Sequence, residues 1–77
     1  MKLTAEQYRA LRMLADAAPR GCTEPALIAQ GVTVATLIDL VRTGYAWGTK
    51  ETARAAGRKI EVVRVKITDA GQRALAH

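Results

Sequence analysis

The chain has 77 residues, a mass of 8.3 kDa and a formal net charge of +5. A chain of this length folds as one small domain that buries only about 60% of the surface of its unfolded state, which excludes a multidomain enzyme. It has one Cys, one His and no Ser, so a disulfide framework, a zinc site and a nucleophile–base pair are all excluded. We therefore expect a single domain over residues 1–77 that is not an enzyme and uses no cofactor or metal.

The expected location follows from the cysteine content and from the first residues. Cys22 has no second thiol to pair with, which is typical of a reducing compartment. Residues 1–7 carry charges where a signal peptide needs apolar residues, and no apolar run approaches the 18 or so residues of a membrane span. We expect a soluble, cytoplasmic protein with no membrane or small-molecule ligand. The basic charge favours a polyanionic partner.

The first element is an amphipathic helix over residues 4–18. Thr4 and Gln7 have the spacing of a capping box. Tyr8, Leu11 and Leu14 recur at helical steps behind it. Pro19 ends the helix, because the residue before a proline avoids helical conformation. Residues 20–22 form a connector, for which an extended conformation is one alternative. With no Phe in the chain, the core must be aliphatic, and its only rings are Tyr8, Tyr45 and Trp47.

Two further helices are predicted over residues 24–30 and 33–43. Thr23 and Thr33 can cap their first turns, and Pro25 is tolerated at the start of a helix. Gly31 ends the second helix, since glycine adopts the left-handed cap conformation without a Cβ penalty. Two short helices joined by about three residues that include a glycine are the sequence form of a helix-turn-helix.

A β-hairpin is predicted over residues 45–67, with its tip near Gly57. Val63, Val65 and Ile67 alternate with charged residues, as in a half-buried strand. Ile60 and Val62 have the opposite parity, which predicts a bulge or a change of face near Val62. A short last helix over residues 68–76 completes the order.

This order of elements resembles the winged helix-turn-helix of bacterial regulators, including the multiple-antibiotic-resistance repressor type. Residues 31–45 correspond to the end of the second helix and the recognition helix, and residues 67–71 (ITDAG) are similar to the "LT-x-x-G" that follows the wing. The chain is also similar to small bacterial proteins of this layout. The resemblance covers residues 4–76 and implies an α+β winged-helix fold: a three-helix bundle with a helix-turn-helix, a hairpin wing and a short C-terminal helix. The long outer helices through which those repressors dimerise are absent.

The positive charge is concentrated in the predicted wing. Residues 48–66 contain six cations and two acids, whereas the rest of the chain has a net charge of +1. A basic wing can follow a phosphate backbone, which supplies affinity with little sequence information. We therefore expect a small double-stranded DNA-binding protein, a transcriptional regulator, with weak groove contacts from the third helix, such as Ala35 or Thr36 against a thymine methyl. The expected DNA-binding residues are Arg54, Arg58, Lys59, Thr33, Thr36 and Arg42.

An interaction module without DNA binding is the alternative. The third helix offers one cation, and its apolar surface at Val34, Ala35 and Ile38 could equally contact a protein partner or a second copy in a homodimer. The wing charge would then serve only to keep an edge strand from pairing with its neighbours. Trp47 is more typical of strand packing than of base stacking, and Cys22 of a small buried side chain than of a redox-sensitive thiol.

Overall fold

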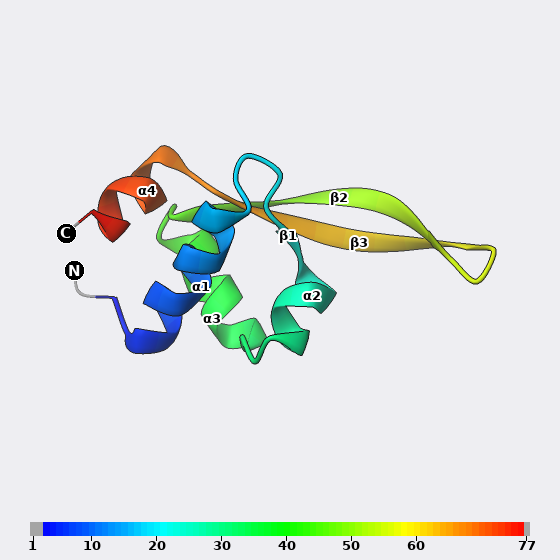
Figure 1. The fold of residues 1–77 in the computed structure, drawn as a ribbon, viewed down its shortest axis with the longest axis horizontal. Helices are drawn as coiled ribbons and strands as arrows, with labels where there is room; N and C mark the ends of the chain where they lie inside the picture. Colours follow the sequence, from blue (N-terminus) through cyan, green and yellow to red (C-terminus); the bar gives the residue numbers. More distant parts are fainter. Residues whose placement is uncertain (1–2, 77) are drawn as a thin grey trace.

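A computed structural model describes residues 3–76 of the chain, apart from the side chain of Ala55. These residues form an α+β domain of four helices and one three-stranded antiparallel sheet with strand order β1-β3-β2 (Figure 1). The predicted domain also included residues 1, 2 and 77, which lie outside this description. The elements are α1 (Ala5–Asp16), β1 (Cys22–Thr23), α2 (Glu24–Ala29), α3 (Val34–Arg42), β2 (Ala46–Ala55), β3 (Arg58–Ile67) and α4 (Asp69–Leu75).

All four helices begin after a threonine whose side chain accepts a hydrogen bond from a first-turn N–H group. Thr4 forms the predicted capping box: the Gln7 N–H donates to Thr4 Oγ1 at 3.0 Å, and the Thr4 N–H donates to Gln7 Oε1 at 2.9 Å. The helix starts are thus confirmed. α1 ends at Asp16, two residues before the predicted end.

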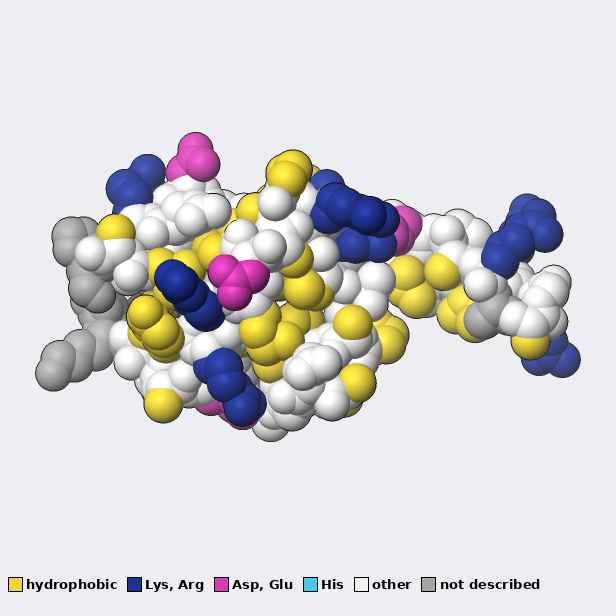
Figure 2. Space-filling model, in the orientation of Figure 1, with side chains coloured by type: hydrophobic (Ala, Val, Ile, Leu, Met, Phe, Trp, Pro, Cys, Tyr) yellow, Lys and Arg dark blue, Asp and Glu magenta, His cyan; other side chains and the backbone are white. Residues whose placement is uncertain are grey.

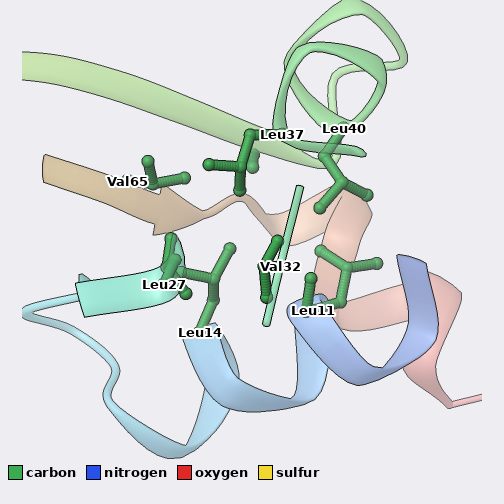
Figure 3. Packing of buried hydrophobic residues seen from close by; sticks show 9 residues of the cluster. Leu11, Leu14, Leu27, Val32, Leu37, Leu40 and Val65 are labelled. Carbon is green, nitrogen blue, oxygen red and sulfur yellow. The ribbon is translucent and has the colours of Figure 1, made fainter. Parts of the chain in front are cut away.

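The core is aliphatic and lies where α1, α2 and α3 meet the base of the sheet. Figure 3 shows its side chains pointing toward one another from these elements. Complete burial of one such Leu side chain stabilises a fold by about 1.5–3 kcal/mol. The fully buried or nearly buried members are Leu11, Leu14, Leu27, Val32, Leu37, Leu40 and Val65, with Ala10 and Ala46.

Two of the three rings that the sequence placed in the core lie elsewhere. Tyr8 is 44% exposed and Trp47 is 45% exposed, whereas Tyr45 packs against the core. The expectation of a core position is therefore wrong for both rings: aliphatic side chains fill the core, and Trp47 lies on the face of β2 opposite to the buried Ala46. Cys22 is partly buried against the same core.

The sheet differs from the sequence prediction at two points. The extended connector is a short strand, β1, in which Cys22 pairs with Val65. The hairpin register runs unbroken from Ala46 opposite Ile67 to Ala55 opposite Arg58, so the predicted bulge near Val62 is wrong. Ile60 and Val62 instead occupy the second face of a regular ribbon, since alternate residues of a strand point to opposite faces.

Two hydrogen bonds join the start of α4 to the turn that precedes β2. The Thr68 hydroxyl donates to the Gly44 carbonyl at 2.5 Å, and the Thr68 N–H donates to the Tyr45 carbonyl at 3.1 Å. Gly71 lies so close to this turn that a Cβ atom on it would overlap the Tyr45 carbonyl oxygen. The spacing of Thr68 and Gly71 is therefore what allows the last helix to pack here.

The outer part of the β2–β3 hairpin projects away from the helices (Figure 1). We call residues 49–64 the arm. It gives the molecule an elongated shape of 44 × 21 × 20 Å. The arm turns through Ala56 (φ +53°) and Gly57 (φ +77°), so the tip lies where it was predicted. Positive φ at both positions is the pattern of a type I′ turn, which matches the twist of a hairpin.

Candidate nucleic-acid interface

The register of the hairpin gives the arm two chemically different faces. Residues directly opposite each other in an antiparallel pair share a face, and Arg54 lies opposite Lys59. Lys50 has the same parity as Arg54, so these three cations form what we call the basic face; Glu61 is the acid on it. The other parity carries Ala53, Ile60 and Val62, which form the apolar face.

Arg58 belongs to the same parity as the apolar face but lies next to the tip. Four cations of the arm have exposed side chains: Lys50, Arg54, Arg58 and Lys59. Within residues 3–76, none of Lys50, Arg54, Arg58 and Lys59 forms an ion pair. Figure 2 shows basic side chains on opposite sides of the outer end of the arm, with apolar side chains nearer the body. The arm therefore presents its unpaired positive charge to solvent.

The two cations nearest the body have partners within the sheet. Arg64 Nε donates to Glu51 Oε1 at 2.8 Å, and both side chains are partly exposed. Lys66 Nζ lies 5.3 Å from the centroid of the Trp47 ring, which is a cation–π distance. Trp47 thus packs across the strand pair with Lys66, the role that the sequence favoured for it.

The outward face of α3 is apolar. Val34, Ile38 and Val41 are 48%, 50% and 47% exposed, although side chains of this kind are usually buried. They border an open groove of about 210 Å³ between α3 and the base of the hairpin, which Gly48 and Val63 close from the sheet side. Polar side chains reach this groove from Glu24 on α2 and from Arg42 at the end of α3.

Thr33 and Thr36 both hydrogen-bond to Glu6 of α1. Thr36 is 6% exposed, and its hydroxyl donates to Glu6 Oε2. Thr33 Oγ1 accepts the Thr36 N–H at 3.2 Å and lies 3.1 Å from the same carboxylate oxygen. The prediction that Thr36 is a surface residue available to DNA is wrong, because its hydroxyl is used in joining α3 to α1. Thr33 is exposed but acts as the N-cap of α3.

This network also changes the ionisation of Glu6. The hydrogen bond from Thr36 holds the pKa of Glu6 below its ordinary value. Partial desolvation opposes that effect, and the hydrogen bond from Thr33 and the charge of Arg9 add to it. The carboxylate form of Glu6 therefore stabilises the α1–α3 contact.

The six residues proposed from the sequence thus fall into four places, one of which is the α1–α3 contact that contains Thr33 and Thr36. Arg54 and Lys59 share the basic face, Arg58 lies beside the tip, and Arg42 is exposed at the end of α3 next to the groove. Lys50 joins the basic face, although the sequence did not single it out; its spacing of four residues from Arg54 was the available signal. Val41 is likewise an unforeseen part of the exposed α3 surface.

Other kinds of site have no support among the described residues. Residues 3–76 bring together no group of three or more side chains suited to hold a metal ion. None of the helices in this part of the chain has the length and apolar content needed to cross a bilayer. In comparisons with known proteins, no family model, curated protein or solved structure matches the chain.

Proposed function

We propose that the protein is a small winged-helix protein that binds double-stranded DNA and acts as a transcriptional regulator. The hairpin is the wing in this proposal, and α2 and α3 are the helix-turn-helix. The order α1-β1-α2-α3-β2-β3-α4 with strand order β1-β3-β2 supports this fold assignment, since α3 and the hairpin then lie side by side. A helix beside a β-ribbon is a combination that can contact a groove and the neighbouring backbone together.

The observation that carries the proposal is the basic face of the arm. Arg54 and Lys59 are like charges placed directly opposite each other, an arrangement that destabilises an isolated strand pair. A phosphate group between them would replace this repulsion with two attractive contacts. Four exposed cations, which form no ion pair within residues 3–76, lie along the arm, and this is the placement expected for contacts with a phosphate backbone.

The salt dependence of DNA binding tests this proposal. If Lys50, Arg54, Arg58 and Lys59 each neutralise one phosphate, log K should fall with log salt at a slope of about −3.6. The measurement is a fluorescence-anisotropy titration of a labelled 20-base-pair duplex at several salt concentrations. Absence of binding at micromolar protein and low salt would overturn the proposal.

Paired variants of equal charge show whether the arm is responsible. Arg54→Ala combined with Arg58→Ala should reduce the slope to about −1.8, because two counterions are no longer released. The matched control combines Arg12→Ala with Arg73→Ala, which removes two exposed cations from α1 and α4. If both double variants reduce the slope equally, the protein binds through its net charge rather than through the arm.

A second candidate function rests on the exposed α3 face. Val34, Ile38 and Val41 could form a protein-interaction or homodimer surface without any DNA binding. Sedimentation equilibrium distinguishes this candidate: a dimer that Ile38→Lys converts to a monomer, together with no DNA binding, would favour it over the first.

A further inference from the structure

We infer that α3 recognises thymine methyl groups, so that the preferred ligand is an A·T-rich duplex. This inference rests on the proposed function. It assigns a chemical target to the outward face of α3, which offers almost no hydrogen-bonding groups. The residues responsible are Val34, Ala35 and Ile38.

These three residues occupy one side of α3, opposite the helix face that enters the core. The spacing of four residues between Val34 and Ile38 places them one turn apart, and Ala35 lies beside them. Val34 and Ile38 are each about half exposed, at 48% and 50%, and Ala35 is also exposed. The core side of the same helix is formed by Leu37 and Leu40, which are buried.

The chemistry of the major groove favours thymine as the base that meets this surface. In the major groove all four bases present hydrogen-bonding groups, and thymine alone also presents a methyl group, at C5. An apolar side chain against a polar base edge displaces water without replacing its hydrogen bonds, which costs free energy. Against a thymine methyl the same side chain buries apolar surface at both partners.

The charges around the α3 face favour DNA as its occupant rather than an apolar protein surface. Arg42 lies in the last turn of α3 at the edge of the groove, and the basic face of the arm adds Lys50, Arg54 and Lys59 on the side that carries Gly48 and Val63. Three acids also border this region: Glu24 in the groove, Asp39 on α3 and Glu61 on the basic face. The cations outnumber them, so phosphates can flank the apolar strip at its Arg42 end and along the arm.

Duplexes that differ only in methyl groups provide the test. Deoxyuridine keeps every hydrogen-bonding group and every phosphate of thymidine but lacks the C5 methyl. Replacing thymine by uracil in an A·T-rich duplex should raise Kd about fourfold for each methyl that α3 buries. Replacing cytosine by 5-methylcytosine in a G·C-rich duplex should lower Kd by a similar factor, with the salt slope unchanged.

Two isoleucine variants assign the effect to α3. Ile38→Ala should abolish most of the thymine–uracil difference, whereas Ile60→Ala should leave it intact. Ile60 is a matched control because it is 43% exposed and lies on the apolar face of the arm. Circular dichroism would show that both variants keep the fold, as expected for half-exposed positions.

The outcomes distinguish failure of methyl recognition from failure of the proposed DNA binding. Equal Kd for thymine and uracil duplexes, with a slope near −3.6, would overturn methyl recognition and leave DNA binding standing. A thymine–uracil difference that persists in Ile38→Ala would also overturn it, because the effect would then come from DNA shape. Failure to bind any duplex would overturn the inference and the proposed function together.

Discussion

The helical body, which is the part of the molecule outside the arm, and the arm differ in how far their side chains are buried. In the body, leucines from three helices and Val65 from the sheet enclose one another almost completely. In the outer part of the arm, residues 56–61 are all exposed, and the pairing of β1 with β3 reaches only as far as Arg64. The body therefore accounts for most of the stability, and the arm can carry charge that a packed core would not tolerate.

The arm depends on the body for its structure. An isolated two-stranded hairpin is at best marginally stable in water. Here β3 begins at the tip and ends inside the core, where Val65 pairs with both β1 and β2. The outer residues are thus held in register by their inner continuation. Substitutions in the two regions should have effects of very different size.

The largest effect is expected in the body. Leu14→Ala removes a side chain that is 0% exposed, and should lower the free energy of unfolding by about 2–5 kcal/mol. Ile60→Ala on the arm should change it by less than about 1 kcal/mol, since little surface is buried there. Urea denaturation followed by circular dichroism measures both. Equal losses would show that the arm is part of the core.

The contact between α4 and the turn before β2 should be nearly as sensitive. Gly71→Ala places a methyl group on the Tyr45 carbonyl and should cost about 1–3 kcal/mol as the helix is displaced. Gln72→Ala is the control, since its side chain is exposed on the same helix and its loss should cost about 0.5 kcal/mol or less. Thermal unfolding of the two variants would contradict the described packing if their midpoints were equal.

At the tip of the arm, one substitution should stabilise the arm without stabilising the helical body. Ala56 has φ +53°, a conformation that costs an ordinary L-residue about 1–2 kcal/mol. Asparagine tolerates it better, and Asn-Gly is the preferred pair of a type I′ turn. Ala56→Asn should slow amide hydrogen exchange in the arm by up to about fivefold and leave exchange in α1 unchanged. Equal slowing in both regions would show that they open together.

The smallest effect is expected at the partly solvent-accessible Glu6, and it depends on pH. Because its folded pKa is lower than its ordinary value, its contribution is complete above that ordinary value and is lost as pH falls through the folded pKa. Glu6→Gln should therefore be less stable than the native chain at pH 7, and the difference should narrow below about pH 4. Urea titrations at both pH values test this. If the stability difference between Glu6→Gln and the native chain widened in acid, the pKa of Glu6 would not be lowered by folding.

The elements that the sequence predicts well are those specified by neighbouring residues. Each helix start was identified because a threonine caps a turn three residues away, as Thr4 does with Gln7. The hairpin tip was identified because Gly57 is needed at positive φ. These signals are local, so no knowledge of the tertiary structure was required.

The features that were missed depend on contacts between distant residues. β1 is a strand because Cys22 meets Val65, and two residues have too little pattern of their own to show it. Thr36 lies four residues before the buried Leu40 and therefore on the same helix face, but its bond to Glu6, thirty residues earlier, is a contact that the sequence pattern does not show. The exposure of Trp47 likewise follows from which face of β2 meets the helices. For the candidate site, sequence located the charged segment, whereas the register was needed to place Lys50, Arg54 and Lys59 on one face.

The central claim is that the arm and the outward face of α3 meet DNA while the rest of the body does not. The most direct measurement is a titration of ¹⁵N-labelled protein with a short A·T-rich duplex, followed by amide chemical shifts. We predict shifts concentrated at residues 50–63 and along α3 from Val34 to Arg42, with α1 and α4 nearly unchanged. Shifts centred on α1 and α4, or none at all at low salt, would contradict the claim.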